Sequence, residues 1–124
     1  MAIPVRRLRV LVVEDEPLIA MTIEFAIEGL GHDMVGPIAR LDKALAAAEA
    51  DDFDCAVIDI NILGGASHAV AKILAGRKRP FILASGYNDL SLPEELRNRP
   101  RLMKPYSGEQ LDTELKRMFE SCAP

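Results

Sequence analysis

The chain has 124 residues, of which 49% are hydrophobic and 27% are charged, and its formal net charge is -4 at pH 7. This length and composition predict one globular domain and exclude a disordered or fibrous chain. The acidic balance argues against a general nucleic-acid binder, which needs a basic stripe. Two cysteines without metal-site spacing, no signal-peptide pattern and no long apolar run predict a reduced, cytoplasmic chain that does not enter a membrane.

The first third of the chain predicts a strand, a helix and a second strand. Residues 8–13 are branched and apolar, which is typical of a strand covered on both faces. A helical pattern begins at Pro17, a residue that suits the first helical position, and Gly31 ends it. Residues 34–38 form a weaker strand, and the proline inside it favours the edge of a sheet.

The middle of the chain repeats this alternation. An alanine-rich helix is predicted over residues 41–50, and residues 55–59 form a second apolar strand that ends on the carboxylate of Asp59. A glycine-containing loop over residues 62–65 then leads to a helix over residues 67–75.

The last third predicts a strand over residues 80–84, a poor helix over residues 88–98 and a short strand over residues 101–103. Pro93 interrupts the poor helix because proline cannot donate a helical hydrogen bond. A capping-box pattern opens a final helix over residues 107–120. Strands alternating with helices predict a doubly wound α/β domain, with a parallel sheet covered on both faces.

Polar side chains follow four of the predicted strands, and in a parallel sheet these four exits lie at one edge. They belong to Glu14 and Asp15, Asp59 and Asn61, Ser85, and Lys104. Carboxylates gathered there would repel one another unless a cation lay between them, and partly hydrated oxygen ligands suit Mg²⁺. A lysine and a hydroxyl at the same edge complete a set suited to phosphoryl transfer onto a carboxylate.

Each of these signals also has a structural explanation when it is taken alone. Acidic residues such as Glu14 favour a helix N-terminus, Asp59 and Ser85 are residue types common in turns, and a lone lysine is usually solvated. Their occurrence together, in this order, favours the functional interpretation. For Tyr87 and Tyr106 the sequence is equally compatible with a packing role and with a signalling role.

From about residue 8 to residue 121 the chain resembles the receiver domain of bacterial two-component response regulators. The resemblance implies a flavodoxin-like, CheY-like fold with a five-stranded parallel sheet of order 2-1-3-4-5 and five helices. It also implies that Asp59 is the phosphoryl acceptor and that Asp15 binds Mg²⁺ directly. Glu14 would bind the ion through water, and Asn61 would bind it through its backbone carbonyl.

By the same resemblance, Ser85 would be the switch hydroxyl, and Lys104 would be the cation that pairs with the phosphoryl group. The Lys104–Pro105 peptide bond would be cis. Receivers usually place an aromatic switch residue where this chain has Arg101. We therefore expect the switch and partner surface to involve Gly86, Tyr87 and Tyr106.

Residues 80–87, followed by Leu92 and Pro93, are similar to the single-domain receivers nicknamed FAT GUY, although Leu83 and Ser85 replace the Phe and Thr of that motif. The similarity implies a sensor histidine kinase, of the HWE type, or a phosphotransfer protein as the partner. We expect residues 1–124 to form a single receiver domain without an output domain, as a monomer or weak dimer that binds neither nucleic acid nor membrane.

The expected function is phosphoryl acceptance on Asp59 with Mg²⁺ and signalling through a changed surface, with slow autodephosphorylation and no other enzymatic activity. One alternative is a small phosphohydrolase with an aspartyl nucleophile. That reaction requires a second aspartate two residues after the nucleophile, and this chain has Asn61 at that position. Another is a pseudo-receiver that only binds partners. The basic residues before the last two strands, residues 77–79 and Arg97, Arg99 and Arg101, lie at the opposite edge, where a solvated face is favoured over a partner surface.

Overall fold

The computed structural model describes residues 7–50, 52–86 and 92–122. A parallel sheet of five strands in the order β2-β1-β3-β6-β7 forms its centre, which is the predicted order 2-1-3-4-5 when the sheet strands are counted along the chain. The strands are β1 (Arg9–Val13), β2 (Asp33–Ile38), β3 (Cys55–Asp59), β6 (Phe81–Ser85) and β7 (Arg101–Met103). The predicted doubly wound α/β architecture is confirmed.

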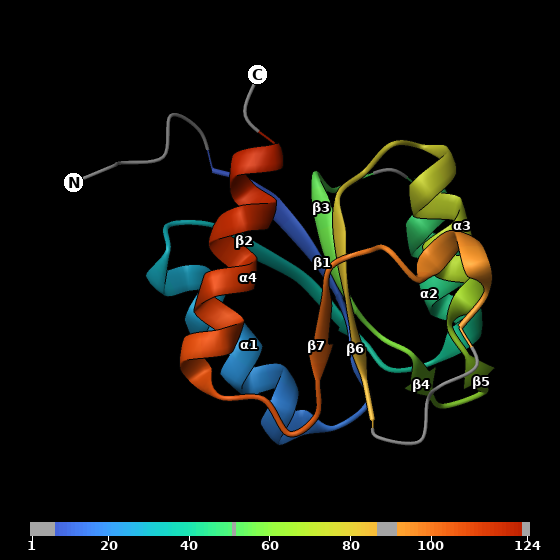
Figure 1. The fold of residues 1–124 in the computed structure, drawn as a ribbon, viewed down its shortest axis with the longest axis horizontal. Helices are drawn as coiled ribbons and strands as arrows, with labels where there is room; N and C mark the ends of the chain where they lie inside the picture. Colours follow the sequence, from blue (N-terminus) through green and yellow to red (C-terminus); the bar gives the residue numbers. More distant parts are fainter. Residues whose placement is uncertain (1–6, 51, 87–91, 123–124) are drawn as a thin grey trace.

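Helices cover both faces of the sheet (Figure 1). They are α1 (Pro17–Gly29), α2 (Leu41–Ala50), α3 (His68–Gly76) and α4 (Gly108–Ser121). Helices α1 and α4 lie on one face, and α2 and α3 lie on the other (Figure 1). Pro17 begins α1 as predicted, and the Ser107 hydroxyl accepts a hydrogen bond from the Gln110 backbone N–H in the predicted capping box.

The prediction of five helices is corrected to four α-helices in the described part of the chain. Within the predicted helix over residues 88–98, the structure has only a 3₁₀ turn, Glu94–Leu96, while residues 88–91 lie outside the described residues. Pro93 directly precedes this turn in an extended conformation, with ψ of 147°. The buried side chains of Leu92 and Leu96 anchor the segment from either side of the proline.

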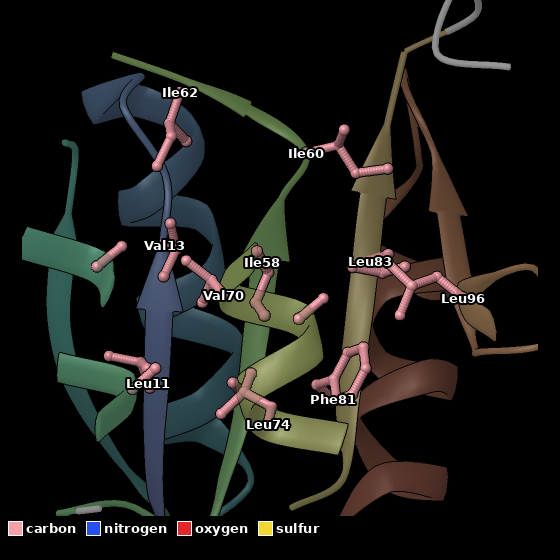
Figure 2. Packing of buried hydrophobic residues seen from close by; sticks show 14 of the residues in the cluster. Leu11, Val13, Ile58, Ile60, Ile62, Val70, Leu74, Phe81, Leu83 and Leu96 are labelled. Atoms are coloured by element: carbon pink, nitrogen blue, oxygen red, sulfur yellow. The ribbon is translucent and has the colours of Figure 1, made fainter. Parts of the chain in front are cut away.

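Strands β1, β3 and β6 are buried on both faces, which explains why they are apolar at nearly every position. Successive side chains point to opposite faces, so Leu11 and Val13 pack toward α2 and α3, whereas Val10 and Val12 join the cluster beneath α1 and α4. Figure 2 shows the first cluster, in which Leu74 of α3 lies beside the sheet. Each fully buried side chain of this size contributes about 1.5–3 kcal/mol.

The loop after β3 contains a small antiparallel hairpin that the sequence did not indicate. It consists of β4 (Asn61–Ile62) and β5 (Gly65–Ala66), where a plain loop was predicted over residues 62–65. Gly64 and Gly65 have φ angles of +100° and +137°, which are strained for other residues. The Leu41 N–H donates to the Leu63 carbonyl at 2.8 Å, so the hairpin is tied to the start of α2.

The fold confirms one further expectation, because strand β2 lies at the edge of the sheet, as the proline inside it indicated. Cys55 is a buried core residue. Across the described ranges, no helix has both the length and the apolar composition needed to span a membrane.

Candidate functional site

The candidate site lies where β1, β3, β6 and β7 end, at the same edge of the sheet. Pairing of Val13 with Ile58 places Glu14, the residue after β1, beside Asp59, the last residue of β3. Ser85 ends β6 and pairs with Met103, so Lys104 follows at the same level. The predicted convergence of these side chains is therefore present, and the Lys104–Pro105 bond is cis as expected.

Lys104 connects the carboxylates of the site. Its Nζ donates to Oδ2 of Asp59 at 2.8 Å and lies 3.8 Å from Oε1 of Glu14. Carboxylate oxygens of Glu14, Asp15 and Asp59 lie within 4.8 Å of one another. Glu14 and Asp59 are buried, whereas Asp15 is partly exposed, so the cluster opens to solvent on one side.

Burial and like charge shape the electrostatics of the site. Burial, together with the charge of Asp59, raises the pKa of Glu14 to about 7. Burial also raises the pKa of Tyr106 to about 12, with a further contribution from Glu14. Burial would lower the pKa of Lys104, but its hydrogen bond to Asp59 and the nearby negative charges outweigh burial and raise that pKa. The ammonium of Lys104 therefore interacts with more than one carboxylate of the site.

Three buried polar atoms of the site have no hydrogen-bond partner among the described residues. They are Oε1 of Glu14, Oγ of Ser85 and the hydroxyl of Tyr106. Leaving such an atom unpaired costs about 1–3 kcal/mol, so these atoms are suited to a ligand that the site receives. The carboxylates are hard oxygen donors with one side open to water, and this donor set fits Mg²⁺.

Four further residues were predicted for the site, namely Asn61, Gly86, Tyr87 and Tyr106. Asn61 is exposed at the start of β4, and its backbone N–H donates to Oδ1 of Asp59 at 3.3 Å. Gly86 directly follows Ser85. Tyr106 is half-buried and packs against the cluster beneath α1 and α4. Tyr87 lies outside the described residues.

Ser67 is a residue of the site that sequence reasoning missed. Its buried hydroxyl donates to the backbone carbonyl of Asp59 at 2.6 Å, and its N–H donates to the carbonyl of Ile60 at 2.7 Å. It thereby holds the β3 exit in place. The only sequence signal was a serine before a helix, which indicates a capping role that this side chain does not perform.

Comparisons with known proteins agree on one class. No family model matches the chain. The phyllosphere-induced regulator PhyR of Methylorubrum extorquens is 35% identical over 89 residues, which cover 69% of this chain but only 33% of that protein. The response regulator PhyR of Brucella abortus is 30% identical with a TM-score of 0.74, and the match covers 94% of this chain and 50% of that one.

SdrG of Sphingomonas melonis Fr1 is matched over nearly its whole length. It is 38% identical with a TM-score of 0.78, and the match covers 91% of this chain and 97% of SdrG. The BeF3-activated conformation of SdrG is 39% identical with a TM-score of 0.70, covering 87% of this chain and 92% of that one.

The doubly wound sheet, with an acidic cluster and a lysine where its strands end, agrees with these comparisons, which point to receiver domains, a class of signalling domains and not of classical enzymes. The chain belongs to the receiver domains of response regulators. Domains of this family typically bind Mg²⁺ and interact with histidine kinases or phosphotransfer proteins.

Proposed function

We propose that the chain accepts a phosphoryl group on Asp59 from a phosphohistidine in a sensor histidine kinase of the HWE type or in a phosphotransfer protein, and that it does so in the cytoplasm. The observation that carries this proposal is the environment of Asp59. This buried carboxylate is hydrogen-bonded to Lys104 and belongs to an acidic cluster, while the hydroxyl of Ser85 at the same edge is buried without a partner among the described residues.

In the proposed reaction, a carboxylate oxygen of Asp59 forms a bond to phosphorus as the phosphorus–nitrogen bond of the phosphohistidine breaks. The electron pair of that bond remains on the imidazole nitrogen. Lys104 pairs with an oxygen of the transferred group. Asp15, Asp59, the Asn61 carbonyl and, through water, Glu14 would hold Mg²⁺, which would supply positive charge to stabilise the phosphoryl oxygens. Hydrolysis later releases inorganic phosphate and restores the carboxylate.

The proposed signal is a change of surface. Phosphorylation adds negative charge and acceptor oxygens next to Ser85, whose hydroxyl is available to donate to them. Rotation of Ser85 would shift Gly86 and the residues that follow it, and Tyr106 has a buried hydroxyl that also lacks a partner in the described chain. The existence of a BeF3-activated conformation of SdrG supports a switch of this kind.

Mass spectrometry after incubation with acetyl phosphate tests the proposal. We expect the wild type to gain one acid-labile phosphoryl group when Mg²⁺ is present and none when it is chelated. Asp59→Asn should gain none, whereas Asp42→Asn, which changes an exposed aspartate of α2, should be labelled like the wild type. Labelling of Asp59→Asn would show that the acceptor is assigned to the wrong residue.

The same experiment separates the two alternatives. A pseudo-receiver would stay unlabelled under all conditions. An aspartyl phosphohydrolase would turn over p-nitrophenyl phosphate many times, whereas a receiver should not. Asn61 supports the receiver assignment because its side chain is an exposed amide, which cannot act as the second acid of a hydrolase.

A further inference from the structure

A cleft of about 620 Å³ lies at the opposite end of the sheet from Asp59. Its lining includes the first residues of β6 and β7, the loops that precede these strands, and the C-terminal half of α4. In Figure 1 this is the end at which the last turn of α4 lies, away from β4 and β5. Because Phe81 begins β6 whereas Asp59 ends the neighbouring parallel strand, the cleft and the phosphorylation site are separate.

The cleft concentrates positive charge in an acidic protein. Five of the fifteen lysines and arginines of the chain line it, but only one of its nineteen acidic residues does. The basic residues are Lys78, Arg79, Arg99, Arg101 and Arg117. The single acidic residue, Glu114, accepts a hydrogen bond from Arg117 at 3.1 Å. The carboxylate of Glu114 is therefore already paired with Arg117 within α4.

Three of these cations lack an acidic partner. Across the described residues, no carboxylate lies within ion-pair distance of Lys78, Arg99 or Arg101. Arg99 and Arg101 are half-buried, so water screens their mutual repulsion less than it would on an open surface. An anion bound in the cleft would attract these cations and offset their mutual repulsion.

The walls of the cleft provide orientation as well as charge. The guanidinium of Arg99 lies 4.9 Å from the centre of the Phe81 ring, which holds the side chain in a defined position. Phe81 and Met118 also line the cleft, but they are only 2% and 5% exposed, so they support the cations and offer little apolar surface to a ligand. A planar guanidinium binds carboxylates through two parallel hydrogen bonds, so the cleft suits carboxylates.

We propose that this cleft binds an acidic segment of a partner protein. Carboxylates of that segment pair with Lys78, Arg99 and Arg101. The cleft has an excess of positive charge, whereas the rest of the molecule has a larger excess of negative charge. The phosphates of a long nucleic acid would extend beyond the cleft and be repelled by the negative charge around it. An acidic protein segment therefore fits the cleft better than a nucleic acid.

The test uses a short fluorescein-labelled peptide of glutamate and aspartate, with fluorescence anisotropy as the readout. We expect the wild type to bind it, with an affinity that falls as salt rises from about 0.05 to 0.5 M. Arg99→Gln/Arg101→Gln should bind at least about tenfold more weakly. The control Arg40→Gln/Lys116→Gln, which removes the same charge from exposed positions outside the cleft, should bind like the wild type.

If the double variant does not fold, as judged by circular dichroism, Lys78→Gln on an exposed loop replaces it, and a loss of affinity is again expected. The proposal is overturned if the wild type fails to bind at millimolar peptide, if the charge-matched control weakens binding equally, or if a glutamine and asparagine version of the peptide binds as well. Tighter binding of a single-stranded oligonucleotide or of ATP also overturns it. Asp59→Asn should bind the peptide normally, so the outcome does not depend on the proposed phosphorylation.

Discussion

Lys104 contacts two carboxylates whose proposed roles differ, and this makes its substitution informative. Lys104→Ala removes the donor to Asp59 and the cation beside Glu14. We expect Mg²⁺ affinity, measured by calorimetry, to stay the same or to rise, because a positive charge leaves the metal site. Phosphorylation by acetyl phosphate should slow by about tenfold to a hundredfold, because a group that stabilises the phosphoryl oxygens is lost.

The matched control for this variant is Lys116→Ala, which removes an exposed lysine of α4 and should change neither quantity. A loss of Mg²⁺ binding in Lys104→Ala, with the control unaffected, would show that Lys104 organises the metal ligands. In that case the proposed division between metal ligands and phosphoryl-pairing cation would be wrong.

Other single residues show the limit of sequence reasoning at this scale. Asp59 and Lys104 could be placed together because parallel strands end at one edge of a sheet. The short contact between them, and the unpartnered hydroxyl of Ser85, depend on side-chain rotamers that no sequence pattern specifies. Ser67 was missed for a different reason, since its partner is a backbone carbonyl, and a backbone carbonyl carries no residue-type signal.

Among the secondary-structure elements, α1 is distinguished by an exposed apolar face. Leu18, Met21 and Phe25 share one side of this helix and are 78%, 49% and 66% exposed. The helix begins at Pro17, two residues after Asp15 of the acidic cluster, so Leu18 in its first turn follows the cluster closely along the chain. If the proposed function is correct, a helix of the phosphodonor protein docks there while its phosphohistidine reaches Asp59.

We therefore expect Leu18→Ser/Phe25→Ser to slow phosphoryl transfer from any histidine kinase that phosphorylates the wild type, by about tenfold or more. Phosphorylation by acetyl phosphate should be unchanged, because that donor needs no docking surface. Lys43→Ser, at an exposed position of α2 on the other face of the sheet, serves as the control. Equal slowing with both donors would mean that the substitutions disturb the site itself.

The elements differ in how well the sequence predicts them, and the reason is length and periodicity. Strands such as β1 and β3 have unbroken apolar runs, and α4 has a capping box, so their positions were predicted closely. The hairpin of β4 and β5 has strands of two residues, too short for any period to show. Its position depends on pairing with residues near α2, which is a tertiary contact.

Across the whole molecule, the two edges of the sheet carry opposite charge. The edge at which the strands end gathers carboxylates, and the edge at which β6 and β7 begin gathers lysines and arginines. The sequence placed basic residues at that second edge, but it could not show that Arg117 of α4 joins them in a cleft. That arrangement depends on how α4 packs against the sheet.

His32 connects several parts of the fold at this same edge, and its titration affects the stability of the whole domain. The buried ring accepts a hydrogen bond at Nδ1 from the Leu8 N–H, at 3.0 Å, and its centre lies 4.2 Å from that of the Phe119 ring. Burial, reinforced by the charge of Arg7, lowers the pKa of His32. The folded protein therefore favours the neutral ring, which alone leaves Nδ1 free to accept.

Because the folded-state pKa of His32 lies below the ordinary histidine value of about 6.5, the unfolded chain binds the proton first as the pH falls. The contribution of His32 to the free energy of unfolding is therefore complete above that value and is lost as the pH drops below it toward the folded pKa. Protonation of Glu14, whose pKa is raised to about 7, stabilises the folded protein over the same pH range, so the effect of His32 is measured as a difference between two proteins. We compare urea unfolding of His68→Gln, in which His32 is the remaining histidine, with that of His68→Gln/His32→Asn, whose amide oxygen can still accept from Leu8. We expect the second protein to be less stable at neutral pH and the difference to shrink between about pH 6.5 and pH 5. A difference that stays constant over this range would mean that His32 does not contribute to the pH dependence.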